Sequence, residues 1–263
     1  MIYFLYQILD VVLMKNKIDT NFNFTTDTPH YWDTFWDNDD ILGGSGYDPD
    51  SESVTLQEYQ RLLWSKQLPN GEYMQLTKGY GAYYLTWNNF RFGSDSIITS
   101  FRYRKYRYML EEVAKSVPDW HKYIENYMQE SYTIGGEIIF PKMMGGINQS
   151  RGCNPFIRDR WDLTIECIRK YYLGEDSPLF NVLEKNKDFF NLFVDFKGYI
   201  DFFYLQDCVS ADYGSTKFWI GNGYFNENPL PKSVAEYKQW IENALIFVRS
   251  RNKRINDALI KEY

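Results

Sequence analysis

The chain has 263 residues, of which 44% are hydrophobic and 24% charged, so it is long enough to fold around a sizeable core. Its net charge of −6 and isoelectric point of about 5.1 exclude a protein that coats nucleic acid with a basic surface. Three cysteines without a C-x-x-C pair, and only two histidines, exclude a zinc ribbon and a histidine-rich metal site. The sparse, odd cysteine count is typical of reduced thiols, and we expect a cytoplasmic protein.

The first 18 residues are expected to form an N-terminal extension, followed by a single α+β domain at 19–263. The apolar run from Met1 to Met14 is interrupted by Asp10, and no positive charge precedes it as in a signal peptide. It is also shorter than the roughly 20 residues of a membrane-spanning helix. We therefore expect no membrane association.

Residues 19–53 are rich in Asp, Asn, Thr, Gly and Ser, and this composition predicts a long loop. A short helix is predicted at 55–65, with Thr55 as its N-cap, and a turn follows at 68–71. After this turn the hydrophobic pattern changes to short segments. It predicts strands in the middle of the chain, at 73–76, 82–87, 96–100 and 132–140.

Helical patterns dominate the remainder of the chain. Helices are predicted at 103–116 and 118–130, and a longer one at 155–172 has Pro155 in its first turn. The chain is then predicted to be helical to its end, except for a strand at 216–220. These elements predict an α+β protein, with a modest mixed sheet from the middle of the chain and a mostly helical C-terminal half.

A glycine-rich loop before the 155–172 helix carries several hydrogen-bond donors. Asn148, Gln149 and Arg151 lie between Gly145 and Gly152. The N–H groups at a helix start attract anions, and arginine can hold a phosphate or carboxylate with two hydrogen bonds. These three residues are therefore candidates for substrate or anion binding. The alternative is that the same groups tie the loop to the domain.

The following helix carries three acids, Asp159, Asp162 and Glu166, at spacings of three and four residues that place them on one face. Two explanations stay open. Neighbouring arginines favour internal ion pairs, whereas a Mg²⁺ or acid–base site would depend on phosphate binding by the adjacent loop. We take Glu166 as a candidate catalytic residue and predict no resident metal.

Glu137 is the second candidate catalytic residue. It lies in a strand predicted to be buried, where a carboxylate is costly unless it is paired or functional. Separately, a basic and aromatic run at 102–108 could stack bases and pair phosphates, or form a solvated helix face.

Several longer motifs follow one another along the chain. They are LLWSKQLPNG at 62–71, INQSRG at 147–152, DRWDLTIECIR at 159–169, SPL at 177–179, DFF at 188–190 and YIDFF at 199–203. In this order they resemble an uncharacterised family of bacterial proteins, a domain of unknown function, over most of the chain. The resemblance implies one domain and supplies no activity.

A second likeness concerns GGEIIFP at 135–141, which is similar to the strand that carries the catalytic glutamate of ADP-ribosyltransferases. Arg61 and Ser94 precede it in the order that those enzymes need. The Ser-Thr-Ser sequence of that family is absent, and Gly135 stands where its members carry Gln or Glu. The likeness implies NAD as a cosubstrate. It also implies that Glu137 orients the nicotinamide ribose and that Arg61 or Arg151 clamps the pyrophosphate.

From these features we expect an enzyme acting on a nucleotide or nucleic-acid substrate, an ADP-ribosyltransferase-like toxin or phage-defence effector. The alternative is a non-catalytic module that binds a nucleotide or a cognate protein partner. An enzyme should have a pocket where Glu137 or Glu166 meets Arg151, and a binding module should have a shallow aromatic patch.

Overall fold

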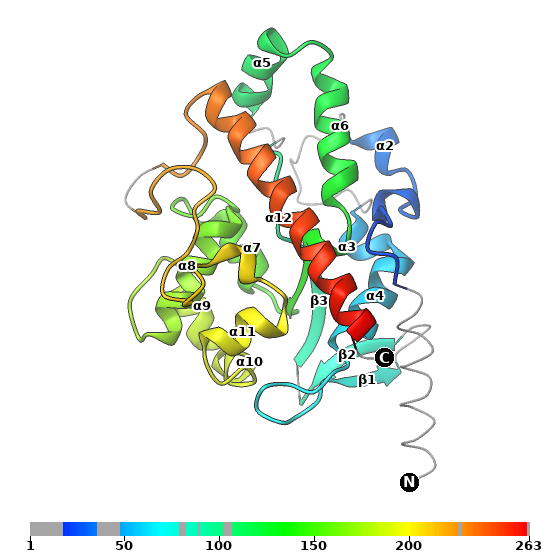
Figure 1. The fold of residues 1–263 in the computed structure, drawn as a ribbon, viewed down its shortest axis with the longest axis vertical. Helices are drawn as coiled ribbons and strands as arrows, with labels where there is room; N and C mark the ends of the chain where they lie inside the picture. The colour runs from blue at the N-terminus through cyan, green and yellow to red at the C-terminus, as the bar shows by residue number, and fades with distance from the viewer. Residues whose placement is uncertain are drawn as a thin grey trace.

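The computed structural model describes residues 18–35, 48–78, 83–88, 90–101, 107–225 and 228–261. The expected N-terminal extension lies outside these residues except for Ile18, which is buried. Figure 1 shows helices packed around a small sheet, with the long helix α12 (Val234–Lys261) running across the molecule. No helix in the described part of the chain is long and apolar enough to cross a membrane.

Four strands form one sheet in the order β1-β2-β3-β4. They are β1 (Gln75–Lys78), β2 (Tyr83–Trp87), β3 (Phe90–Ser96) and β4 (Glu137–Pro141). In the register of β3 and β4, Ser96 lies opposite Glu137 and Ser94 lies opposite Ile139. The α+β prediction is confirmed. Every described strand pair is antiparallel, however, where a mixed sheet was expected.

The chain leaves the sheet after Ser96. Beyond this residue, side chains from helices donate hydrogen bonds to its backbone carbonyls. Tyr127 and Trp240 both donate a hydrogen bond to the carbonyl of Thr99. A strand partner cannot occupy the same acceptor. The strand predicted at 96–100 is therefore wrong beyond its first residue.

Four short elements precede the sheet. They are η1 (Phe24–Thr26), α2 (Tyr31–Thr34), α3 (Pro49–Glu52) and α4 (Val54–Trp64). Ser53, rather than the predicted Thr55, caps α4, because its Oγ accepts the N–H of Leu56 at 3.0 Å. The carboxylate of Asp27 accepts hydrogen bonds from the Ser53 hydroxyl and the Thr55 N–H, and so ties the N-terminal loop to this helix start.

The remaining elements are helical. Between β3 and β4 lie α5 (Arg107–Ser116), α6 (Trp120–Ser131) and η3 (Ile134–Gly136). After β4 come α7 (Ile147–Cys153), α8 (Trp161–Tyr172), α9 (Phe180–Lys185), α10 (Lys187–Asn191), α11 (Phe196–Phe202), η4 (Gln206–Cys208) and α12. The helical C-terminal half is confirmed. The strand predicted at 216–220 is wrong, because only one isolated bridge, between Val209 and Thr216, forms there.

Two predictions around Pro155 are also wrong. The stretch expected to be a loop contains α7, and the helix expected to begin at Pro155 begins at Trp161. Arg158 and Asp159 separate the two helices in left-handed backbone conformations, with φ of 50° and 65°. The glycine-rich loop leading directly into a long helix, on which the predicted anion site depended, is therefore not formed.

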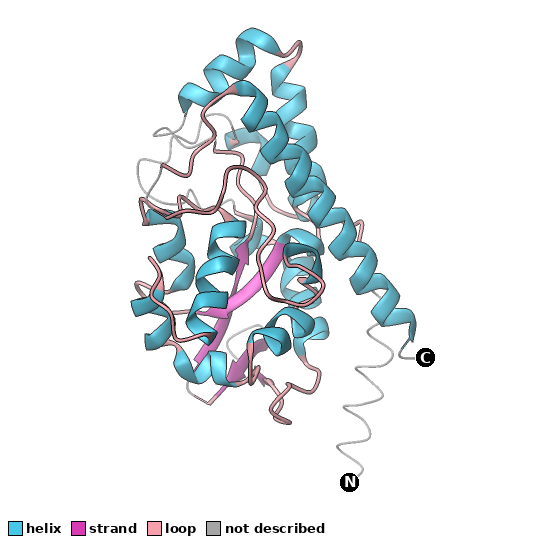
Figure 2. Cartoon of the chain, turned by 60° about the vertical axis from the view of Figure 1, so that its left-hand side comes forward, coloured by secondary structure: helices cyan, strands magenta, loops and turns pink. Residues whose placement is uncertain are grey.

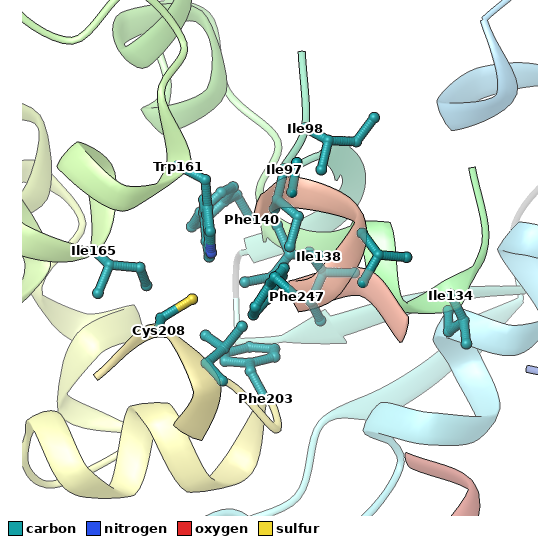
Figure 3. Packing of buried hydrophobic residues seen from close by; sticks show 14 of the residues in the cluster. Ile97, Ile98, Ile134, Ile138, Phe140, Trp161, Ile165, Phe203, Cys208 and Phe247 are labelled. Carbon is teal, nitrogen blue, oxygen red and sulfur yellow. The ribbon is translucent and has the colours of Figure 1, made fainter. Parts of the chain in front are cut away.

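Buried apolar side chains surround β4, and all five residues of this strand are buried. Ile138 and Phe140 lie close to Trp161, Phe203 and Phe247 in the core (Figure 3). Figure 2 shows the strands with helices on either side. This packing fixes the first residue of β4 deep inside the protein.

Candidate active site

Glu137 is held where β3 ends and β4 begins. Side chains alternate between the two faces of a strand, and residues opposite each other on neighbouring strands share a face. Ser94 and Ser96 therefore lie on the same face of the sheet as Glu137, and Asp95 lies on the other. The two faces neutralise their acids in different ways.

Glu137 is fully buried, at 0% exposure. The Ser94 hydroxyl lies 3.5 Å from its Oε2, and the carboxyl of Asp50 lies within hydrogen-bonding reach of its carboxyl. Burial raises the pKa of Glu137 well above its usual range, and the nearby charge of Asp50 raises it further. Both effects favour the protonated form of Glu137.

Asp50 reaches this position from α3, whose start is set by Asp48 and Pro49. The Asp48 side chain accepts the N–H of Asp50 at 3.1 Å, and proline suits the first turn of a helix. The Ser96 N–H donates to Oδ2 of Asp50 at 3.1 Å and fastens α3 to the end of β3. Burial, and then the charge of Asp48, raise the pKa of Asp50 to about 8.

The two carboxyls form a pair that shares a proton. Carboxyl groups in hydrogen-bond contact repel each other when both are ionised, so Glu137 keeps its proton while Asp50 loses its own near pH 8. An acid and a base then lie side by side. Asp50 and Ser94 are half-buried residues at the edge of the pair, whereas Asp50 Oδ1 and Glu137 Oε1 are themselves buried. Such a pair can give one proton and accept another.

Ser94 is brought to Glu137, as the predicted site requires, and α4 supports it there. Gln60 donates to the Ser94 hydroxyl at 3.0 Å, and the Trp64 indole N–H donates in turn to the side-chain oxygen of Gln60. Arg61 lies half-buried on the same helix, but the contacts of Ser94 and Glu137 do not include it. The structure therefore joins two of these three predicted residues.

Arg151 is not available to a ligand, which corrects its predicted role. It is fully buried, and its five N–H groups bind Asp95 at 2.5 Å, the carboxylate and carbonyl of Asp159, the Ser96 carbonyl and the Thr164 hydroxyl. Burial alone would lower the pKa of Arg151, but Asp159 and Asp95 outweigh it and raise this pKa. Arg151 cross-links three segments of the protein.

The other two members of the predicted loop site do not join Arg151. Asn148 and Gln149 lie exposed in the first turn of α7, and Gln149 accepts the N–H of Gly145 at 3.0 Å. Their amides point to a local turn while the guanidinium of Arg151 is directed into the core. For Arg151 the alternative interpretation holds, because its hydrogen bonds and ion pairs tie this segment to the domain.

Glu166 is likewise held in structural contacts. Both of its carboxylate oxygens accept hydrogen bonds from Arg169 at 2.8 Å, and the Thr216 hydroxyl donates to it at 2.9 Å. Asp162 on the same helix is paired with Arg160 at 2.6 Å. The ion-pair interpretation of these acids is thus confirmed, but Asp159 precedes α8 and does not share a helix face with the other two. The contacts of Arg151 include neither Glu166 nor Glu137, so the structure does not bring these residues together as expected.

Two further expectations concern metals and nucleic acid. Within the described ranges, no group of three or more His, Cys, Asp or Glu side chains is placed to hold a metal ion. Most of the basic and aromatic run, residues 102–106, lies outside the described residues.

Asp50 is the residue that sequence reasoning missed. The signal for a helix start was present in Asp48-Pro49-Asp50, but the partner of Asp50 lies 87 positions away on β4. The Gly135-Gly136 motif before Glu137 has a packing origin. A side chain at Gly136 would place its Cβ 1.9 Å from the carbonyl of Ser131.

The sequence profile of DUF6994, described as a family of unknown function, matches residues 18–255. The resemblance to an uncharacterised domain family is therefore confirmed. No match is found among curated proteins or among solved structures.

Proposed function

The chain belongs to the DUF6994 family of unknown function, so its activity has to be inferred from its own geometry, and we propose that it is an enzyme that uses Asp50 and Glu137 for general acid–base catalysis. The observation that carries this proposal is the close approach of the Asp50 and Glu137 carboxyls, which among the described residues form no ion pair with a cation. Carboxyl groups with pKa values raised toward or above neutrality are typical of catalytic sites.

The reaction class that suits the pair best is hydrolysis by an activated water. Ionised Asp50 accepts a proton from water, and the resulting hydroxide attacks an electrophilic carbon of the substrate. Protonated Glu137 gives its proton to the leaving atom, so the pair ends with one proton, as it began. Proton transfer between the two oxygens then restores the starting state.

The charge around the pair favours a neutral or cationic substrate. Asp48 and Asp95 lie near Asp50 and add negative potential, and Arg151 is already neutralised by two carboxylates. A nucleotide, NAD included, would bring phosphates to two carboxyls that form no ion pair with a cation among the described residues. The ribose-orienting role implied for Glu137 would require the same phosphate-bearing cosubstrate and is disfavoured with it.

The remaining expectations are biological. Cys153, Cys167 and Cys208 are all free thiols, which supports a cytoplasmic location as part of the proposal. No feature of the described residues bears on a toxin or phage-defence role.

The proposal is tested with p-nitrophenyl esters, amides and glycosides, in neutral and cationic forms, as probe substrates. We expect hydrolysis whose rate rises with pH through about 8, as Asp50 ionises. Asp50→Asn and Glu137→Gln should each lower kcat/KM by about 10²–10⁴-fold while the protein stays folded.

Glu166→Gln is the matched control, because it removes a partly buried carboxylate outside the pair. It should leave the rate unchanged. Hydrolysis that survives both variants of the pair, or no hydrolysis of any probe by the wild type, would contradict the proposal.

A further inference from the structure

The carboxyl pair lies beside a buried arginine, Arg251 of α12, which makes no ion pair with any residue that the structure describes. Arg251 is fully buried. Its Nε donates to the Phe203 carbonyl at 3.0 Å, and its Nη1 donates to the carbonyls of Gly135 and Glu137 at 2.9 and 2.6 Å. Among the described residues its Nη2 has no hydrogen-bond partner. The positive charge thus meets carbonyl dipoles but no carboxylate in contact.

This arrangement differs from that of the other buried arginines in the described ranges. Arg151 and Arg160 are each paired with a carboxylate within 2.6 Å. Burial lowers the pKa of Arg251 to about 10, whereas Cys208 and Glu137 act to raise it. Arg251 therefore stays charged at neutral pH. A buried cation without a paired anion favours ionisation of the acid nearest to it.

We propose that Arg251 is a positioning residue of the Asp50–Glu137 pair, which fixes the backbone of Glu137 and whose charge helps the pair to release its first proton. The first part follows from the hydrogen bond to the Glu137 carbonyl. The effect on proton release follows because the guanidinium of Arg251 forms no other ion pair among the described residues. The catalytic consequence rests on the proposed function, because a pair that kept both protons would contain no base.

The test compares variants that separate charge from backbone support. Arg251→Gln and Arg251→Met remove the charge, and Arg251→Lys retains it. Asn252→Ala is the matched control, because Asn252 accepts the Gly135 N–H at 2.6 Å and donates to Thr133 at 2.8 Å. It anchors the same turn without a charge.

The readout is the infrared C=O band of the protonated carboxyls, assigned with Asp50→Asn and Glu137→Gln and followed as pH rises. The wild type, Arg251→Lys and Asn252→Ala should lose the first proton of the pair near pH 8. Both neutral variants should lose it later, by on the order of one pH unit. An unchanged midpoint in both neutral variants, or an equal shift in Asn252→Ala, would overturn the inference.

Arg251→Lys decides the matter if neither neutral variant folds. It loses backbone hydrogen bonds but keeps the charge, so an unchanged midpoint supports the inference and an upward shift of its midpoint contradicts it. The titration needs no substrate. A lack of hydrolytic activity would therefore count against the proposed function alone. A carboxyl titration that is unchanged in the neutral Arg251 variants would count against the role of Arg251 alone.

Discussion

The two faces of the sheet at the end of β3 bury their acids by different means. On one face the guanidinium of Arg151 neutralises Asp95, and on the other protonation neutralises the carboxyl of Glu137 beside Asp50. A buried ion pair has to stay intact, because either partner alone is an uncompensated charge. A proton can leave and return. The first arrangement can therefore only hold the fold together, whereas the second can also do chemistry.

Breaking the ion-paired face should have the largest effect. Arg151→Met leaves Asp95 and Asp159 without their buried cation, so we expect a loss of about 3–5 kcal/mol in the free energy of unfolding. Urea unfolding followed by tryptophan fluorescence measures it. Activity should fall only in step with the folded fraction.

The matched control adds Asp95→Asn to the Arg151→Met protein. Because the second change removes one of the unpaired charges, it should recover part of the lost stability, as a double-mutant cycle would report. A stable Arg151→Met protein that has lost its activity would instead restore Arg151 as a ligand-binding residue.

The proton-sharing face should make stability depend on pH. The pKa of Asp50 rises from 3.8 to about 8 on folding, and that of Glu137 rises too, so the folded state binds more protons than the unfolded chain between about pH 4 and pH 8. The stabilisation is fully present below this window and is lost as pH rises through it. The slope is about 1.4 kcal/mol per pH unit for each proton.

Asp50→Asn should flatten this slope, measured as the free energy of unfolding in urea from pH 5 to pH 9. Glu175→Gln serves as the control, because Glu175 is exposed and its hydrogen bond to Lys170 lowers its pKa out of the tested range. A wild-type slope equal to that of Asp50→Asn would mean that the two carboxyls titrate independently of folding.

Ser94→Ala should have the smallest effect. Its hydroxyl lies 3.5 Å from Glu137, which is a long hydrogen bond, and Gln60 retains the Ile138 carbonyl as a second acceptor. We expect a change of less than about 1 kcal/mol in the free energy of unfolding. A loss of several kcal/mol in the same urea experiment would show that the pair depends on this hydroxyl.

The sequence was informative where chemistry is local. The α+β class and the helical C-terminal half followed from hydrophobic periodicity, and the cost of burying Glu137 singled it out before any fold was known. The helix that begins at Pro49 was missed, because the composition of residues 19–53 predicted a loop.

The errors arose where distant segments meet. Arg151 has the same sequence context whether it faces a ligand or Asp95, and only the fold brings in that partner from 56 positions away. The same holds for Asp50 and for Arg251, whose contacts at Gly135 and Glu137 are more than 100 positions distant. Local sequence patterns cannot distinguish a guanidinium that is paired within the core from one that is available to a substrate.

The most direct test of the account is a carbon-13 NMR titration of the side-chain carboxyls of Asp50 and Glu137 in the wild-type protein. Resonances are assigned with Asp50→Asn and Glu137→Gln. We expect Asp50 to titrate near pH 8, with Glu137 still protonated at that pH. Titration of both groups near their ordinary values, at about pH 4, would contradict the proton-sharing pair and the function proposed from it.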